Sequence, residues 1–222
     1  MNENKNSVEL LGHYGGDKTH GLSAWTSTYR DLTQDKLDRL PKLLKHLAEN
    51  GHETPFEKSV LHFLVDTEIA THIQLLKHRI GVSINAESAR YKELKEDKFY
   101  IPLDFYEVPV DYKHGIHGYM SWGEVLHDVS LESDRRYHAC LEDVEKALGR
   151  KRAKESARFF KMYNSQITSD IMFNWRSFAH FLHLRRSEHA QKEICEVADS
   201  MLDLVKQIAG DPFKHTIEAF GL

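Results

Sequence analysis

The feature that most constrains the fold is that two kinds of apolar pattern alternate along one chain. Leucines recur at helical spacing over 37–47, a segment that ends at the helix-stop dipeptide Asn50-Gly51. The segments 59–65 and 166–173 are instead short and rich in Val, Leu, Ile and Phe, which is typical of strands. The sequence therefore predicts an α+β fold, with several helices packed around a small, mostly antiparallel sheet.

Local signals predict the other elements. Ser121 and Glu124 form a capping box, which predicts the start of a long helix. The chain has no internal repeat and no Gly/Ser/Pro-rich linker, so we expect a single domain over 1–222. The other expected elements are a helix from Asp66 or Thr67 to about Arg79, a loop over 81–90, a short strand over 99–101, an excursion loop over 104–119, helices over about 151–162, 175–184 and 187–208, and a short terminal helix from Pro212.

Composition and charge exclude several classes of protein. Hydrophobic residues make up 41% and charged residues 29% of the chain, which excludes a wholly disordered protein. The net charge of −4 disfavours a general nucleic-acid binder. No apolar run approaches the roughly 18 residues of a membrane span, and the N-terminus resembles no secretory signal. The two cysteines, Cys140 and Cys195, fit a reducing cytoplasm rather than a disulfide framework.

The segment 74–91 holds the richest cluster of chemical groups. Lys77, His78 and Arg79 end a predicted helix, and the loop that follows carries Ser88 and Arg90. Cations combined with hydroxyl and amide donors suit a phosphate or another oxyanion. Basic residues also favour the C-terminal end of a helix because of its macrodipole. The spacing by itself leaves both interpretations open.

A second cluster lies over 174–191. His180 and His183 share a helix face at i,i+3 and could bind a metal with Glu188 or His189. The spacing is not the HExxH zinc signature, so contact with a ligand is the alternative. The chain has no GxGxxG, P-loop or GxSxG motif. Both cysteines fall within predicted helices, so we predict no thiolate nucleophile.

Four segments resemble the flavin-dependent thymidylate synthases. Lys77-His78-Arg79 followed by Ser88 is similar to the family signature of Arg-His-Arg, seven or eight residues, and Ser. The segment 52–57 resembles the family's GHETPFEH turn, and Arg158 matches an arginine upstream of a strand. The segment 174–191 resembles the family's C-terminal block. The four segments occur in the family's order and extend over roughly 20–210.

The resemblance implies an activity and its partners. It implies a homotetramer that makes thymidylate (dTMP) from deoxyuridylate (dUMP), with 5,10-methylenetetrahydrofolate as one-carbon donor. NADPH would be the reductant and would act through bound FAD, without a cysteine nucleophile. The resemblance implies no metal, no nucleic-acid partner and no membrane partner.

The resemblance also assigns site residues. The dUMP contacts would be Gln74, Leu75, Leu76, Lys77, Ala86, Glu87, Ser88, Ala89, Arg90, Arg158 and Arg185. The FAD contacts would be Thr54, Lys77, His78, Arg79, Asn174, Trp175, Arg176 and His180. Arg185 matches a catalytic arginine that faces the uracil ring, where a permanent positive charge would stabilise negative charge developing on the ring. Ser88 would bind substrate rather than act as a nucleophile, because the sequence places no histidine base beside it.

The sequence departs from the family pattern at four points. Lys77 replaces the first arginine of the signature, which keeps the charge but loses the bidentate fork. Eight residues, not the commoner seven, separate Arg79 from Ser88. Ala86 falls where an acidic residue is common, and Glu87 could take its place. His180 stands where asparagine is frequent.

Two other functions stay open on the sequence. One is a metal-dependent hydrolase that uses His180, His183 and His189, which metal analysis would detect. The other is a non-catalytic nucleotide-binding protein that keeps the anion site without flavin. Flavin reduction by NADPH would separate that protein from the enzyme.

Overall fold

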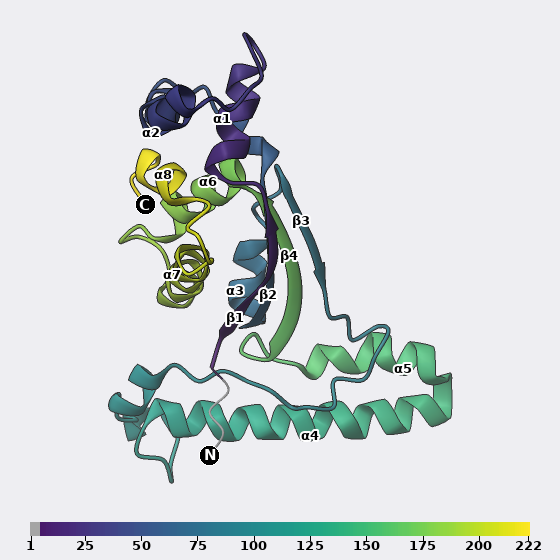
Figure 1. Cartoon of the computed structure of the whole chain (residues 1–222). Helices are drawn as coiled ribbons and strands as arrows, with labels where there is room; N and C mark the ends of the chain where they lie inside the picture. Colours follow the sequence, from purple (N-terminus) through teal and green to yellow (C-terminus); the bar gives the residue numbers. More distant parts are fainter. Residues whose placement is uncertain (1–4) are drawn as a thin grey trace. The chain divides into compact units, whose positions relative to one another are not determined.

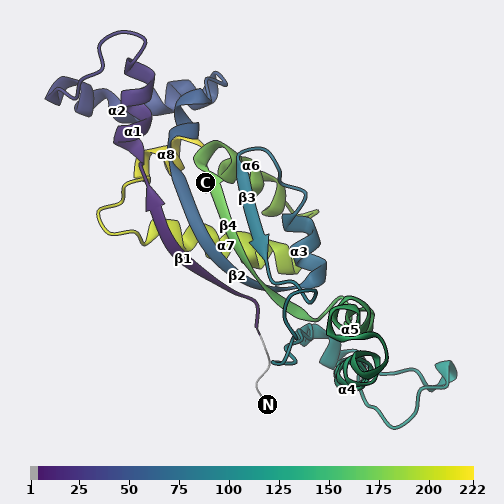
Figure 2. The same ribbon diagram turned by 90° about the vertical axis from the view of Figure 1, so that its right-hand side faces the viewer.

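A computed structural model describes residues 5–222 and confirms the α+β class. Within these residues the chain forms eight α-helices and a four-stranded antiparallel sheet. The strands are β1 (Ser7–Tyr14), β2 (Val60–Glu68), β3 (Val82–Ala86) and β4 (Gln166–Asn174). They lie side by side in the order β1-β2-β4-β3, which Figure 2 shows face-on.

More residues lie in helices than in strands. The helices are α1 (Asp17–Trp25), α2 (Gln34–Glu49), α3 (Ile69–Leu75), α4 (Trp122–Leu148), α5 (Arg150–Ala157), α6 (Trp175–Arg185), α7 (Lys192–Lys206) and α8 (Lys214–Ala219). Four short 3-10 turns accompany them: η1 (Thr54–Lys58), η2 (Leu103–Glu107), η3 (Tyr112–His114) and η4 (Arg158–Phe160). No helix among the described residues is long and apolar enough to cross a lipid bilayer.

The chain divides into two compact units, which we describe separately. The sheet unit contains residues 7–65, 74–85 and 169–222, and the long-helix unit contains residues 5–6, 66–73 and 86–168. The strands β2 and β4 each have residues in both units. The single domain over 1–222 stays a prediction.

In the sheet unit, the helices α6, α7 and α8 lie on one face of the sheet (Figure 1). Alternate residues of β2 point into that face, and Leu61, Phe63 and Val65 are fully buried. His62 is more exposed and contacts the Asp170 side chain at 2.7 Å. The period-two burial therefore defines one apolar and one polar face of the strand.

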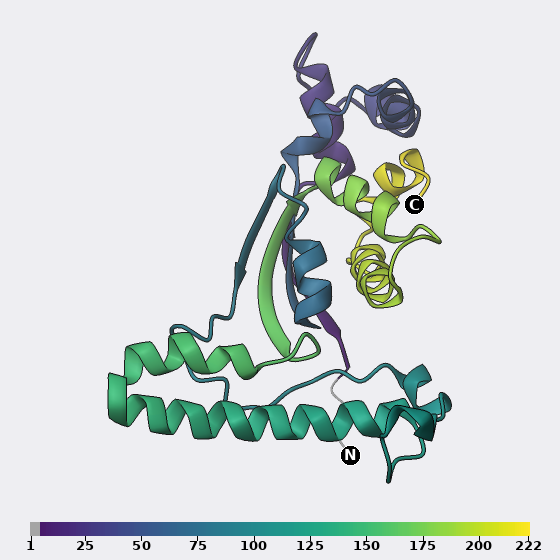
Figure 3. The ribbon, with the colours of Figure 1, turned by 180° about the vertical axis from the view of Figure 1, so that it is seen from behind.

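In the long-helix unit, α4 and α5 run side by side (Figure 3) and enclose a small core of Tyr137, Leu141, Ala153 and Ala157. The predicted capping box at the start of α4 is confirmed. The Ser121 hydroxyl accepts from the Glu124 backbone N–H, and the Glu124 carboxylate accepts from the Ser121 N–H, each at 3.3 Å. Both bonds satisfy backbone donors that the helix itself leaves unpaired.

The predicted helix 66–79 is wrong at both ends. Asp66 and Thr67 extend β2 instead of capping the helix, because the strand continues its pairing with β4: the Thr168 hydroxyl donates to the Asp66 carboxylate. The helix α3 ends at Leu75, and the next two backbone bonds, Lys77 N–H to Gln74 O at 3.2 Å and His78 N–H to Leu75 O at 3.0 Å, form a tight turn.

The predicted loop over 81–90 is confirmed at residues 81 and 87–90 but is wrong over 82–86, which form the edge strand β3. Val82, Ile84 and Ala86 are half-buried while Ser83 and Asn85 are exposed. The polar residues of this strand face solvent, so its period-two pattern contains only three apolar positions. The strand β3 runs antiparallel to β4. Just before β3 begins, the Asn174 N–H at the end of β4 donates to Gly81 O at 3.0 Å.

Three other boundaries move. The helix predicted over 151–162 ends at Ala157 and continues as η4, so Arg158 lies in a 3-10 turn. The helix predicted from Ser187 begins at Lys192, because the chain first makes a turn with Ala190 N–H to Ser187 O at 3.0 Å. The excursion over 104–119 contains η2 and η3, and Phe99 forms only an isolated bridge with Ser165.

Candidate active site

A cavity of about 880 Å³ lies in the sheet unit, within the size range of ligand pockets. It is lined by the turn after α3, by one face of α6 and by residues of α2 and α8. Six of the residues assigned to FAD or dUMP line this cavity: Lys77, His78, Arg79, Arg176, His180 and Arg185. The structure thus brings together two segments that are about 100 residues apart in the sequence.

The turn over 77–81 is fixed against the first turn of α6. Asn174 caps this helix by accepting from the Ser177 N–H at 2.9 Å, and the Ser177 hydroxyl donates to Ile80 O at 2.6 Å. Gly81 has a φ of +63°, and a Cβ there would collide with the Asn174 and Ser177 side chains. Only glycine both adopts this positive φ readily and lacks the Cβ that would collide, so Gly81 sets the position of the basic turn.

Arg185 is held by a neutral histidine. Its Nε donates to Nε2 of His78 at 3.0 Å, which requires that this ring nitrogen carry no proton. Burial, and then the charges of Arg185 and His180, lower the pKa of His78 to about 4. The ring also packs edge-on against Phe181, with centroids 5.0 Å apart. His78 therefore orients the Arg185 guanidinium and does not compete with it as a second cation.

The cations of the cavity fall into two kinds. Nε and Nη1 of Arg176 donate to Glu53 and Glu57, each at 2.7 Å, and these bonds raise the pKa of Arg176 further. Lys77 and Arg79 are exposed and form no ion pair within residues 5–222. An anionic group at the cavity would find these two charges unneutralised. With the volume and the close-fitting turn at Gly81, they fit a flavin dinucleotide with its pyrophosphate.

Glu53 and Glu57 are residues that the sequence analysis did not assign. They lie at the HETPFE turn that carries the family resemblance, and their carboxylates neutralise Arg176. The only hint in the sequence was that two carboxylates lie four residues apart within a segment that carries the family resemblance. No sequence pattern connects them to an arginine more than 100 residues away.

In the long-helix unit, Ser88 begins a tight turn. Its carbonyl accepts from the Tyr91 N–H at 3.0 Å, and its hydroxyl accepts from the Arg90 N–H at 3.4 Å. Glu155 of α5 contacts two of the assigned arginines: its carboxylate lies 3.7 Å from Nη2 of Arg90, and its carbonyl accepts from Nε of Arg158 at 3.2 Å. The assigned arginines Arg90 and Arg158 therefore lie together in this unit.

The acidic residue at the end of β3 is Glu87, and its carboxylate is engaged in local contacts. One oxygen accepts from the Thr168 backbone N–H at 3.2 Å, and the other pairs with Lys92. Ala86 is the last residue of the strand. The carboxylate of Glu87 thus fixes the start of the Ser88 turn.

Two assigned residues have buried side chains. Leu75 and Trp175 belong to the hydrophobic core of the sheet unit, and the Trp175 ring stacks on Phe213 with centroids 5.3 Å apart. In this conformation neither residue exposes its side chain or its backbone to a ligand. Leu76 and Thr54 are exposed, Thr54 at the start of η1.

The histidines of the second cluster separate. His180 and His183 line the 880 Å³ cavity, as their shared helix face predicted. His189 is highly exposed in the turn before α7, and its partner is the neighbouring Glu188 at 3.7 Å. Among residues 5–222, no three or more His, Cys, Asp or Glu side chains are grouped so that they could hold a metal ion.

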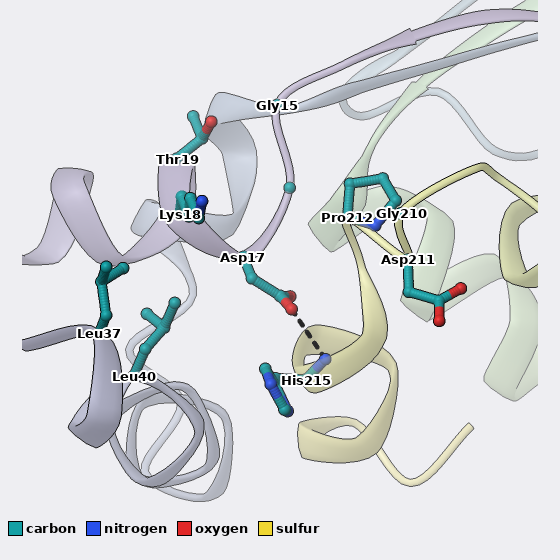
Figure 4. Close-up of a pocket in the computed structure, with 11 residues that line it drawn as sticks. Gly15, Asp17, Lys18, Thr19, Leu37, Leu40, Gly210, Asp211, Pro212 and His215 are labelled. Carbon is teal, nitrogen blue, oxygen red and sulfur yellow. Dashed lines mark hydrogen bonds between the residues drawn. The ribbon is translucent and has the colours of Figure 1, made fainter. Parts of the chain in front are cut away.

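A second cavity, of about 450 Å³, lies where α1 meets the start of α8 (Figure 4). Its most buried charge, Asp17, accepts from the backbone N–H groups of His215 and Thr216 at 2.9 and 2.8 Å. Burial raises the pKa of Asp17, and these bonds oppose that shift. None of the assigned site residues lines this cavity. Asp17 ties the N-terminal helix to the C-terminal one.

Comparison with known proteins gives a consistent result. The family described as "Thymidylate synthase complementing protein" matches residues 9–210. The flavin-dependent thymidylate synthase of Pseudothermotoga lettingae is 34% identical over 90% of this chain and 85% of its own length. That of Thermosipho melanesiensis is 32% identical over 91% of this chain and 86% of its own. A crystal structure of the UMP/dUMP methylase PolB from Streptomyces cacaoi, bound with 5-Br dUMP, has a TM-score of 0.78 and 26% identity, and covers 98% of this chain and 95% of that one.

The match spans the HETPFE turn, the basic turn, Arg158 and the C-terminal block, so it includes every segment that carried the resemblance. The chain belongs to the thymidylate synthase complementing protein family, the family of the flavin-dependent thymidylate synthases.

Proposed function

We propose that this protein methylates dUMP to dTMP, with 5,10-methylenetetrahydrofolate as the one-carbon donor and NADPH as the reductant. The names of the relatives support the reaction, and the ligand of the PolB structure supports a uridine nucleotide as substrate. The observation that carries the proposal is the Arg185 guanidinium, held in the cavity by a neutral His78.

The residues of the sheet unit are proposed to hold FAD. Lys77 and Arg79 would face its phosphates, while Thr54, Asn174, Trp175, Arg176, His78 and His180 complete the assigned set. When bound, the flavin supplies the redox chemistry of the methylation. The protein orients the rings and sets the charge around them.

Arg185 is proposed to act on the uracil ring. C5 of uracil becomes nucleophilic only as negative charge develops on the ring, and a fixed cation stabilises that charge. A guanidinium keeps its proton at every working pH, so it serves as an electrostatic stabiliser and not as an acid. Neither cysteine lines the cavity, in keeping with a reaction without a cysteine nucleophile.

The other assigned residues are proposed to bind the nucleotide. These are Gln74, Leu75, Leu76, Lys77, Ala86, Glu87, Ser88, Ala89, Arg90 and Arg158, with the arginines paired to its charged groups. PolB is described as a methylase of both UMP and dUMP, so both nucleotides belong in the assay. We further propose a single domain that assembles as a homotetramer in the cytoplasm.

The test starts with flavin. The protein is loaded with FAD, freed of excess and reduced anaerobically with NADPH, and dTMP formation is then followed by chromatography. Bleaching of the flavin spectrum and dTMP formation are expected. A colourless protein that cannot take up FAD would contradict the proposal and leave a binding protein without flavin.

The Arg185→Ala variant tests the catalytic assignment. We expect turnover to fall by about 100-fold or more, because a charge that stabilises the transition state is lost, while FAD remains bound. The matched control is Arg186→Ala, since Arg186 is the next residue and pairs with Asp199 outside the cavity. Loss of flavin from Arg185→Ala would instead place Arg185 at the cofactor.

A further inference from the structure

A polar relay extends from Arg185 away from the cavity. Nη1 of Arg185 lies 3.4 Å from Oε1 of Gln74, and Nη2 lies 3.4 Å from the Gln74 carbonyl oxygen. Nε2 of Gln74 donates to Oε1 of Gln191 at 2.6 Å. Nε2 of Gln191 then donates to the Glu193 carboxylate at 2.7 Å. All four residues belong to the sheet unit.

The ends of the relay fix the direction of every bond in it. A carboxylate only accepts hydrogen bonds, so Gln191 must turn its NH₂ group toward Glu193 and its oxygen toward Gln74. Gln74 must then turn its NH₂ group toward Gln191 and its oxygen toward Arg185. A guanidinium only donates, so this last orientation is the one that Arg185 requires.

The carboxylate at the end of the relay, Glu193, is held in place by burial. Glu193 is 8% exposed and lies in the first turn of α7, where a negative charge is favoured by the helix dipole. The two short bonds belong to this anchored end, and the two longer contacts belong to Arg185. Contacts of this length commonly tighten when substrate binds.

We propose that Gln191 and Glu193 are positioning residues for Arg185, because they set the amide of Gln74 so that its oxygen holds the guanidinium. The inference rests on the proposed function, in which Arg185 faces the uracil ring. Without the relay, the Gln74 amide can rotate and present its NH₂ group to the guanidinium, which would push Arg185 out of position.

The first variant removes the central link. Gln191→Leu is expected to lower kcat by about 10- to 100-fold, with KM for dUMP changed less than about threefold, because a displaced catalytic group costs rate more than binding. The control is Gln207→Leu, the same substitution at the exposed C-terminal end of α7. If Gln191→Leu matches this control, the proposal fails.

The second variant introduces a negative charge at the centre of the relay, beside Glu193. Gln191→Glu sets two carboxylates in contact, and such a pair holds a shared proton until the pH rises. While the proton is present, the carboxylic acid donates to Glu193 and still accepts from Gln74. Once the proton is lost, the new carboxylate still accepts from Gln74, but repulsion from Glu193 pushes it away and frees the Gln74 amide. Activity relative to the unsubstituted protein should therefore fall as the pH rises through the titration of the carboxylate pair.

Other groups near the relay do not supply this pH dependence. Arg185 stays charged, and the pKa of His78 near 4 keeps that ring neutral across the range. His180 is present in both the variant and the unsubstituted protein, so any effect of its titration is the same in the two pH profiles. The double variant Gln191→Glu/Glu193→Gln restores a donor beside the new carboxylate and should remove the pH dependence. A double variant that keeps the pH dependence of Gln191→Glu would overturn the proposal.

A stability cycle tests the relay without catalysis. Unfolding free energies of Gln191→Leu, Arg185→Met and the double variant should be non-additive, because the relay couples the two sites. Additive effects would overturn the proposal even if the enzyme were inactive. Failure of the proposed function is distinguishable, since it appears as absence of dTMP formation by the unsubstituted protein.

Discussion

At the scale of single residues, His20 shows how burial fixes a protonation state. The Thr216 hydroxyl donates to Asp17 at 2.6 Å, so its oxygen accepts from Nδ1 of His20, which lies 2.9 Å away. Nε2 of His20 then accepts from the Ser59 hydroxyl at 2.8 Å. The ring is neutral, and burial lowers its pKa to about 3. This buried chain ties α1 and α8 to the start of β2 and satisfies every ring nitrogen.

This histidine should make the protein sensitive to acid. The pKa of His20 is about 3 when folded and about 6.5 when unfolded, so the unfolded chain binds more protons between these values. Its contribution to stability is therefore complete above about pH 6.5 and is lost as the pH falls toward 3, at up to about 1.4 kcal/mol per pH unit.

The measurement is urea unfolding at several pH values for the unsubstituted protein and for His20→Gln, which keeps a donor and an acceptor. The variant should have a shallower decline in the free energy of unfolding below about pH 6.5. Asp17, whose pKa is raised, is present in both proteins and acts in the opposite direction. Equal slopes in the two proteins would show that His20 is not the group responsible.

At the scale of elements, the contact between the basic turn and α6 decides where Lys77, His78 and Arg79 lie. The helix cap at Asn174, the Ser177 hydroxyl and the positive φ of Gly81 all act at the same point. The helix that Asn174 caps thus also defines the start of β3 and lines the cavity.

Gly81→Ala tests this contact. The substitution adds a Cβ in the left-handed region and forces it into two side chains, so we expect a loss of stability of about 2–4 kcal/mol and weaker FAD binding. Gly51→Ala is the matched control, because Gly51 has a similar φ of +67° but nothing within 4 Å of the added Cβ. That control should lose only about 1–2 kcal/mol and keep its FAD affinity. Equal losses in thermal unfolding and in flavin titration would contradict the account.

At the scale of the whole molecule, the assigned residues fall in two units. Arg185, His78 and the basic turn belong to the sheet unit, whereas Ser88, Arg90 and Arg158 belong to the long-helix unit. In the proposed function, the residues of the sheet unit would hold the cofactor and face the reacting ring, and those of the long-helix unit would contact the nucleotide.

Arg158→Ala should therefore weaken dUMP binding without removing FAD. The loss of a charge-assisted hydrogen bond is expected to raise the dissociation constant by about 10- to 100-fold. Titration calorimetry with dUMP measures it, and the flavin spectrum measures the cofactor. Arg135→Ala on α4 is the control, because Arg135 is exposed and pairs with the nearby Glu132. An unchanged affinity in Arg158→Ala would remove this residue from the substrate site.

The sequence by itself determined the α+β class, the capping box at Ser121 and the segments that carry the family. These depend on local signals, such as side-chain period and cap residues, or on order along the chain. It also placed His180 and His183 on one face of α6, because helical spacing alone decides that.

Tertiary structure decided the rest. The strand β3 forms because β4 offers it backbone partners, and β2 continues through Asp66 for the same reason. Three features depend on contacts between residues distant in sequence: the pairing of Arg176 with Glu53, the neutral state of His78 and the link of the relay from Gln74 to Gln191. Spacing along a chain does not define distance across a fold, so only the packed structure could place these groups together and set their charge.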